Sequence, residues 1–170
     1  MSLRRIKGFT LLELMVTVAV MAILASIAFP SFQTTIRSSR VAAAHNELLG
    51  LMNLARSEAI RSGRGGGVCA SADGATCSGS WSDGALAYAD ANGDGSKGNG
   101  ETVLRFVTAS GRVVVTGPAD GIAFDGRGRR RASANQELTM KPATCSANVE
   151  QKRLMTVNAS GQVRTVKGIC

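Results

Sequence analysis

The longest predominantly apolar run of the chain lies near its N-terminus, over residues 9–29. As a helix, its 21 residues are about 31 Å long, which matches the thickness of a bilayer core. Arg4, Arg5 and Lys7 precede the run, so the positive-inside rule places the N-terminus in the cytoplasm and the residues after the run outside. The pattern predicts one membrane-spanning helix followed by an exported remainder.

After this span the chain becomes more polar but keeps a helical period over residues 30–62. Apolar residues recur at spacings of three and four, which places them on one face of an amphipathic helix; they are Ala44, Leu48, Leu51, Ala55 and Ala59. Gly63 is a suitable stop, and Arg61 suits the negative end of the helix dipole. We expect one long helix with its apolar face packed by a globular head and with His45 as a polar surface residue.

Residues 63–170 alternate short apolar segments with glycine-rich turns. This alternation is typical of antiparallel strands. The strands are expected at 67–70, 85–89, 102–107, 112–116, 121–124, 137–140, 153–158 and 162–167. The predicted fold class is therefore α+β, with a long N-terminal helix packed on an antiparallel β-sheet head.

Glu13 interrupts the apolar run about one turn from its start. A charged side chain in the middle of a membrane helix costs about 2.5–3.5 kcal/mol on insertion scales. Either the side chain snorkels to the interface, or it has a dedicated cationic partner. A cut between Gly8 and Phe9 would create such a partner, because it releases a free α-amino group on this chain or on a neighbouring chain.

The segment KGFTLLEL, residues 7–14, resembles the processing site of type IV pilins and type II secretion pseudopilins. The resemblance implies that residues 1–8 are a leader, that a prepilin peptidase cuts after Gly8, and that the new N-terminal Phe9 is methylated. It also implies that Glu13 pairs with the N-terminus of a neighbouring pilin during assembly. The protein is then expected in the inner membrane with its head in the periplasm, and later in an extracellular pilus.

The segment LARSEAI, residues 54–60, and the β-rich head resemble the FimT/GspH branch of minor pilins. This resemblance implies a low-copy subunit that helps to assemble a type IV pilus and contacts other pilins through its N-terminal helix. The alternative is the corresponding type II secretion pseudopilin, which contacts secreted proteins. The sequence has one histidine and no G-x-S-x-G, P-loop or H-E-x-x-H motif, so we expect no enzyme.

All four cysteines lie in the exported part, where disulfides persist. Cys69 and Cys77 bracket a turn-rich segment, which makes a local bridge easy, and a second bridge between Cys145 and Cys170 would tie down the C-terminus. Four cysteines allow three pairings, and the sequence does not choose among them. Zinc is not expected, because no closely paired cysteines occur.

Four residues satisfy the calcium-loop pattern D-x-[DN]-x-[DN]-G-x5-E: Asp90, Asn92, Asp94 and Glu101. However, the flanking segments are expected to be strands rather than the helices of an EF-hand, and Lys97 puts a positive charge inside the loop. An acidic hairpin loop without a cofactor is therefore the favoured interpretation. A Ca²⁺ site, and with it a metal-binding adhesin head, is the alternative.

The formal net charge is +8, and it is unevenly distributed. Residues 65–101 contain five acids and one base, whereas residues 102–170 contain eleven bases and four acids. Clustered bases bind the phosphates of double-stranded DNA without sequence preference; the residues expected to do so are Arg127, Arg129, Arg130, Arg131, Arg164 and Lys167. A solvated basic face is the alternative.

A short segment near the C-terminus also suggests DNA binding. FimT proteins that serve natural transformation bind DNA through a C-terminal Gly-Arg-x-Arg motif. The segment 161–164, Gly-Gln-Val-Arg, resembles that motif in part, because Gln162 stands where the first arginine is expected. The resemblance therefore implies a role for Arg164 alone.

Overall fold

The computed structural model describes residues 9–170, so the predicted leader 1–8, with Gly8, lies outside the described residues. One helix, α1, runs from Leu11 to Ser62. Near its start, the Oγ1 atom of Thr10 accepts a hydrogen bond from the Glu13 amide at 3.2 Å. It ends at Gly63, which has a left-handed φ of 69° and whose amide donates to the Ala59 carbonyl at 3.0 Å. The predicted long helix and its stop at Gly63 are confirmed.

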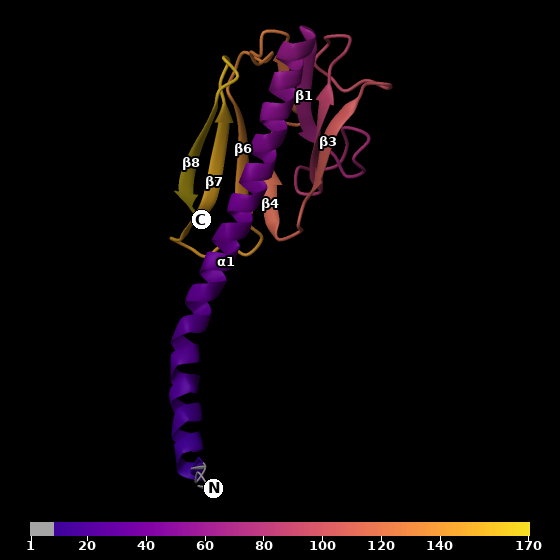
Figure 1. Ribbon diagram of the computed structural model, residues 1–170. Coiled ribbons are helices and arrows are strands. Elements are labelled where there is room, and N and C mark those ends of the chain that lie inside the picture. The colour runs from indigo at the N-terminus through magenta and orange to yellow at the C-terminus, as the bar shows by residue number, and fades with distance from the viewer. Residues whose placement is uncertain (1–8) are drawn as a thin grey trace, which may run out of the picture. The chain divides into compact units, whose positions relative to one another are not determined.

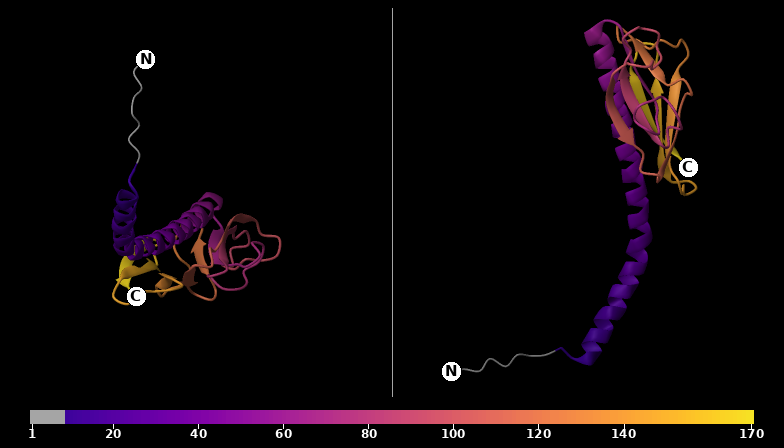
Figure 2. Two further views of the ribbon diagram at one scale, coloured as in Figure 1. Left: turned by 90° about the horizontal axis from the view of Figure 1, so that it is seen from below. Right: turned by 90° about the vertical axis from the view of Figure 1, so that its right-hand side faces the viewer.

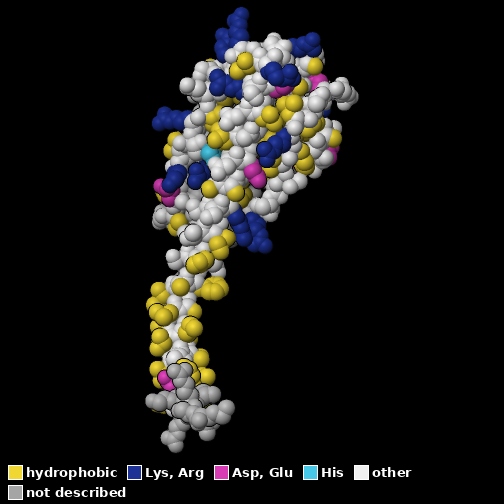
Figure 3. Space-filling model, in the orientation of Figure 1, with side chains coloured by type: hydrophobic (Ala, Val, Ile, Leu, Met, Phe, Trp, Pro, Cys, Tyr) yellow, Lys and Arg dark blue, Asp and Glu magenta, His cyan; other side chains and the backbone are white. Residues whose placement is uncertain are grey.

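The part of α1 up to Ile36 belongs to one of two compact units. Its apolar side chains are exposed, for example Phe9 at 79% and Leu12 at 74%, and Figure 3 shows them along the helix. By length and composition α1 is suited to crossing a membrane, with a mean hydropathy of 2.4 in its most apolar window. So large an apolar surface requires lipid or other protein around it.

Residues 37–170 form the second compact unit, which we call the head unit. Its eight strands form two antiparallel sheets, in the orders β3-β2-β1-β5 and β4-β6-β7-β8. Both sheets lie on the same side of the C-terminal part of α1 (Figures 1 and 2). The strands are β1 (Gly65–Ala70), β2 (Gly84–Ala89), β3 (Val103–Thr108), β4 (Val113–Thr116), β5 (Ile122–Asp125), β6 (Gln136–Pro142), β7 (Glu150–Val157) and β8 (Val163–Ile169).

Each predicted strand is present within a few residues of its expected position. The strands nevertheless form two sheets instead of one, because β5 returns to pair with β1 while β4 pairs with β6. The alternation of side chains along a strand indicates which face is buried and carries no information about the neighbouring strand. The antiparallel α+β prediction is confirmed, and the structure adds that the strands form two sheets.

The main core lies between α1 and the two sheets. Leu51, Ala55 and Ala59 of the predicted helical stripe are fully buried in it. His45 is also buried, at 6% exposure, and its Nε2 lies 2.8 Å from Oγ1 of Thr165 on β8. The prediction that His45 is a surface residue is therefore wrong. The helical periodicity of the sequence predicts that this side of α1 is polar and exposed, but the second sheet covers it.

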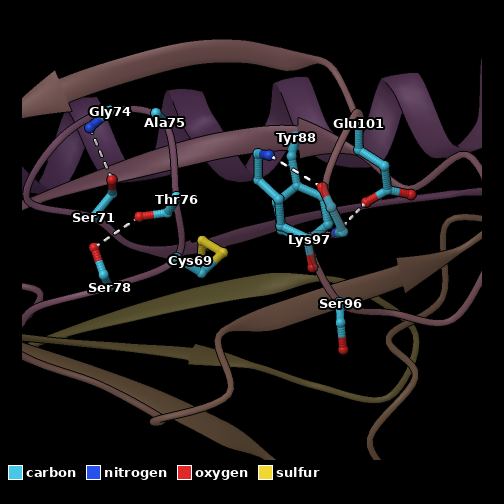
Figure 4. Close-up of a disulfide and its surroundings, with 12 residues drawn as sticks. Cys69, Ser71, Gly74, Ala75, Thr76, Ser78, Tyr88, Ser96, Lys97 and Glu101 are labelled. Atoms are coloured by element: carbon cyan, nitrogen blue, oxygen red, sulfur yellow. Dashed lines mark hydrogen bonds between the residues drawn. A yellow bond between two sulfur atoms is a disulfide. The ribbon is translucent and has the colours of Figure 1, made fainter.

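A smaller cluster packs on the other face of the first sheet, around Cys69, Leu86 and Tyr88. The loop after β2 reaches this cluster, since the Tyr88 hydroxyl donates to the Gly95 carbonyl at 2.9 Å. The disulfide Cys69–Cys77 closes the loop after β1 beside Tyr88 (Figure 4). A second disulfide, Cys145–Cys170, ties the end of β8 to the connection between β6 and β7. Of the three possible pairings, this is the one in the structure.

Helix α1 and strand β1 approach each other closely at Ala55 and Gly66. A Cβ atom on Gly66 would lie 2.5 Å from the Ala55 carbonyl oxygen, a separation that packed atoms do not tolerate. Gly66 is therefore required for the two backbones to lie at their observed separation.

We expect Gly66→Ala to lower the free energy of unfolding by about 1–3 kcal/mol, because the added methyl group must push the helix from the sheet. The measurement is thermal unfolding of the full-length chain in detergent, followed by the fluorescence of Trp81, the single tryptophan, which is 6% exposed. Gly50→Ala is the matched control, since a Cβ there has no atom within 4 Å and alanine favours helix. Equal stability of the two variants would contradict the close approach.

Candidate functional site

The two basic segments singled out in the sequence are neighbours in the structure. One is the stretch after β5 and the other includes the turn between β7 and β8; we call residues 125–131 and 158–164 the basic turns. The Arg130 amide donates to the Ala159 carbonyl at 3.1 Å, and Arg130 Nε donates to the Asn158 carbonyl at 3.3 Å. Figure 3 shows several Lys and Arg side chains at the end of the head unit where α1 finishes, with others spread over the rest of that face.

Arg56 of α1 holds both basic turns. Its Nε donates to the Gly128 carbonyl at 2.8 Å, and its Nη2 donates to the Ser160 carbonyl at 3.2 Å. Gly161 has a left-handed φ of 77°, and a Cβ on it would collide with the Gly128 carbonyl oxygen. Arg56 lies in the family-like segment 54–60, but no local pattern indicates this role, because its partners are distant in sequence.

Asp125 organises the first basic turn. Its Oδ1 accepts the amides of Arg127 and Arg129 at 3.0 and 2.9 Å, and its Oδ2 pairs with Arg129 Nη2 at 3.1 Å. Burial raises the pKa of Asp125, but the two amides and the Arg129 guanidinium lower it by more than burial raises it. The pKa therefore lies below its ordinary value. The carboxylate is therefore ionised at neutral pH and offsets the charge of Arg129.

Four of the six predicted DNA contacts are exposed on the basic turns: Arg127, Arg129, Arg131 and Arg164. Arg129 pairs with Asp125, and Arg131 Nη2 lies 3.6 Å from Asp90 Oδ2. Within residues 9–170, Arg127 and Arg164 form no ion pair. Their charges are thus the ones most available to an external anion.

Arg130 has a different environment from its neighbours. It is only 5% exposed, since its backbone bridges to Phe124 and its amide binds the second basic turn. Arg130 is therefore a buried residue and not part of an exposed basic surface, and its contact with DNA stays a prediction. A run of three arginines suggests a uniform basic surface, but the fold directs the middle one inward.

Lys167 lies apart from the basic turns. It pairs with Glu150 at 3.3 Å and lies three residues beyond Arg164 along β8, a separation of about 10 Å. Side chains alternate along a strand, so the two project from opposite faces of the second sheet, and Lys167 shares its face with Thr165, the partner of His45. Lys167 therefore lies outside the basic turns and their candidate interface.

The acidic loop 90–101 folds on its own carboxylates. Asp90 is 1% exposed and accepts the amides of Gly93, Asp94 and Gly95. Glu101 accepts the amides of Ala91, Asn92 and Gly98. Among residues 9–170 no group of three or more His, Cys, Asp or Glu side chains is arranged to hold a metal ion. The loop amides donate hydrogen bonds to both carboxylates, and Arg131 offsets the charge of Asp90. The geometry of the loop therefore gives no support to the alternative of a Ca²⁺ site.

A family model described as Type II transport protein GspH matches residues 44–161, which is more than half of the chain. This chain belongs to the GspH family. A second model, described as the Prokaryotic N-terminal methylation motif, matches residues 3–29. The predicted membership among type IV pilins and type II pseudopilins is confirmed.

Solved structures share the fold of this GspH-family protein. The type IV minor pilin FimU of Pseudomonas aeruginosa has a TM-score of 0.57 at 16% identity, over 75% of this chain and 89% of FimU. The minor pseudopilin EpsH, from the Type 2 Secretion System of Vibrio cholerae, has a TM-score of 0.50 at 16% identity, over 74% of this chain and 94% of EpsH. At such identity the likeness shows the fold alone.

A curated relative matches a shorter stretch. The Type IV major fimbrial protein FimA of Dichelobacter nodosus is 43% identical over 63 residues, which are 37% of this chain and 40% of FimA. The chain thus matches less than half of the length of that relative. The family to which the chain belongs is one of pilins and pseudopilins, which are structural proteins.

We expect Arg56→Met to lower the free energy of unfolding by about 1–3 kcal/mol, because two carbonyl acceptors lose a charged donor. Amide hydrogen exchange should accelerate at Gly128 and Gly161, whose amides donate to Asp125 and Asn158 within the basic turns. Arg61→Met is the matched control, since the Arg61 side chain is 75% exposed and pairs with its helix neighbour Glu58. Unchanged exchange in the Arg56 variant would show that Arg56 does not hold the turns.

Proposed function

We propose that this protein is a minor pilin of a type IV pilus that takes part in pilus assembly and binds extracellular DNA for uptake in natural transformation. The observation that supports DNA binding is the meeting of the two basic turns, with Arg127, Arg129, Arg131 and Arg164 exposed on them. Membership in the GspH family and the fold shared with FimU support the pilin part of the proposal.

The proposed route begins in the inner membrane, which residues 9–29 span once, with the head in the periplasm. A prepilin peptidase removes residues 1–8 and the new N-terminal Phe9 is methylated, in keeping with the methylation motif matched at residues 3–29. The amphipathic part of the helix, residues 30–62, then carries the exported β-rich part, residues 63–170, into the extracellular pilus. Other pilins cover the exposed apolar surface of α1.

We expect Glu13→Ala to be inserted in the membrane and processed but not to enter pili, because a carboxylate in an apolar span serves pairing with a neighbouring N-terminus. Intact-mass spectrometry of membranes should find both wild type and variant beginning at methylated Phe9, and sheared pili should contain wild type only. Gly8→Ala should instead retain the leader in the membrane fraction. Normal pilus incorporation of Glu13→Ala, or Met1 retained in filaments, would contradict the proposed route.

The proposed DNA contacts are to the phosphate backbone. Phe124, the aromatic residue just before the first basic turn, is fully buried, so it offers no ring for base stacking. The segment 126–129 reads Gly-Arg-Gly-Arg and has the complete Gly-Arg-x-Arg spacing that segment 161–164 has only in part. Both segments belong to the basic turns, and binding through them should not depend on sequence.

We expect the full-length protein in non-ionic detergent to bind duplex DNA with a dissociation constant of about 10⁻⁴–10⁻⁶ M at physiological salt. The logarithm of affinity should fall linearly with the logarithm of salt concentration, with a slope of about −0.9 per phosphate engaged. Arg164→Gln should weaken binding and flatten that slope by about one unit. Gel shift and fluorescence anisotropy over a salt series measure both quantities.

Lys167→Gln is the matched control for this experiment, because it removes the same charge from the opposite face of the second sheet. It should leave the affinity and the slope close to those of wild type. Equal losses in the two variants would show that net charge, and not the basic turns, determines binding. No gel shift at low salt, where electrostatic attraction is strongest, would reject DNA binding.

A second candidate function is that of a type II secretion pseudopilin that contacts secreted proteins. The description of the matching family and the fold shared with EpsH favour it. Deleting the protein and measuring both protein secretion and DNA uptake separates the two candidates. Loss of secretion with normal uptake supports the pseudopilin, and the reverse supports the DNA-binding pilin.

A further inference from the structure

A groove of about 430 Å³ opens beside the basic turns. Its walls include Asp125, the three consecutive arginines Arg129, Arg130 and Arg131, and Ala159 of the second turn. The hydrogen bonds from Arg130 to Asn158 and Ala159 hold the two walls together. The groove is therefore part of the folded structure of the head unit and does not depend on one loop alone.

The charge of Arg130 is not balanced within this groove. Arg129 pairs with Asp125 and Arg131 with Asp90, whereas no carboxylate among residues 9–170 pairs with Arg130. Its Nε donates to a carbonyl, but Nη1 and Nη2 are both buried without a hydrogen-bond partner in the described part of the chain. The positive charge of Arg130 thus has no carboxylate partner, and its two terminal amino groups have no hydrogen-bond acceptor, within the described residues.

An unmatched buried guanidinium is unfavourable, because the charge has lost its water and gained no partner. In keeping with this, desolvation lowers the pKa of Arg130 below its ordinary value. A replacement of the arginine by an apolar residue would remove this penalty. The presence of Arg130 beside a groove is explained if an anion from outside the chain accepts hydrogen bonds from its Nη1 and Nη2 atoms.

We propose that this groove binds a single phosphate group, whose oxygens accept hydrogen bonds from Nη1 and Nη2 of Arg130 and face the positive charges of Arg129 and Arg131. The two parallel donors of a guanidinium match two oxygens of one anion. Each of the two unesterified oxygens of a backbone phosphate can accept more than one hydrogen bond, so the flanking arginines can share them with Arg130. The side chains of Arg129 and Arg131 are 57% and 32% exposed, so they can shift to open access to Arg130.

This inference deepens the proposed function and rests on it for the source of the phosphate, which is the backbone of DNA. The groove then makes Arg130 an interior contact, distinct from the exposed contacts of Arg127 and Arg164. It also predicts that an isolated phosphate ion binds without any nucleic acid, which allows the site to be tested separately.

The test is thermal unfolding of the full-length protein in detergent, followed by Trp81 fluorescence, in sodium phosphate and in sodium chloride or acetate of equal ionic strength. The melting temperature should rise with phosphate concentration as expected for a ligand that binds the folded state, and not with chloride or acetate. Arg130→Met should abolish the phosphate-dependent rise. Arg112→Met, which removes an exposed arginine just before β4, should retain it.

Ala159→Glu is a second variant that does not remove the buried arginine. Ala159 is exposed and lines the groove, so the new carboxylate can pair with Arg130 and occupy the place of the phosphate. It should raise the melting temperature in chloride and remove the response to phosphate. The same melting temperature in phosphate and in chloride up to about 100 mM, for the wild type, would overturn the proposal.

DNA binding measured on the same variants separates this proposal from the proposed function. A phosphate response in a protein that binds no DNA would support the site and reject the DNA-binding function. DNA binding that Arg130→Met leaves unchanged, with no phosphate response in the wild type, would reject the site and retain the function. Weakened DNA binding in both Arg130→Met and Ala159→Glu, together with a phosphate response, supports both.

Discussion

The close approach of α1 to β1 is the constraint on which the head unit depends. Gly66 has no side chain where a Cβ would meet the Ala55 carbonyl oxygen, and Ala55 and Ala59 are fully buried. Small residues on both elements bring the helix onto the first sheet, and the larger side chains of the core fill the space on either side. The helix thereby becomes the common support of two sheets that do not share a strand.

The position of the basic turns follows from that contact. Because Ala55 faces the sheet, the next residue, Arg56, points to the side of the helix. There its side chain donates hydrogen bonds to the carbonyls of Gly128 and Ser160. Glycines at positions 128 and 161 allow the two turns to meet at this arginine. The same segment, residues 54–60, thus supplies the packing of the helix and the arrangement of the candidate DNA interface.

The uneven charge of the chain is partly resolved by folding. The acidic middle and the basic last third meet at Asp90 and Arg131, and two further pairs join Asp125 to Arg129 and Glu150 to Lys167. The acidic loop thus has an arginine beside it, in addition to its own amides. Most exposed pairs of this kind contribute little to stability, so their main effect is to determine which arginines keep an unbalanced charge.

The sequence predicted the long helix, its stop at Gly63 and all eight strands, because periodicity and glycine placement are local properties. It did not predict the division into two sheets, the burial of His45 or the role of Arg56, since each depends on partners far along the chain. Arg129, Arg130 and Arg131 show the limit most clearly. A sequence window adds their charges together, but Arg129 pairs with Asp125 of its own turn and Arg131 with the acidic loop, while Arg130 is buried without a carboxylate. A basic run is therefore evidence for an anion partner only after the fold has shown which of its charges remain unpaired.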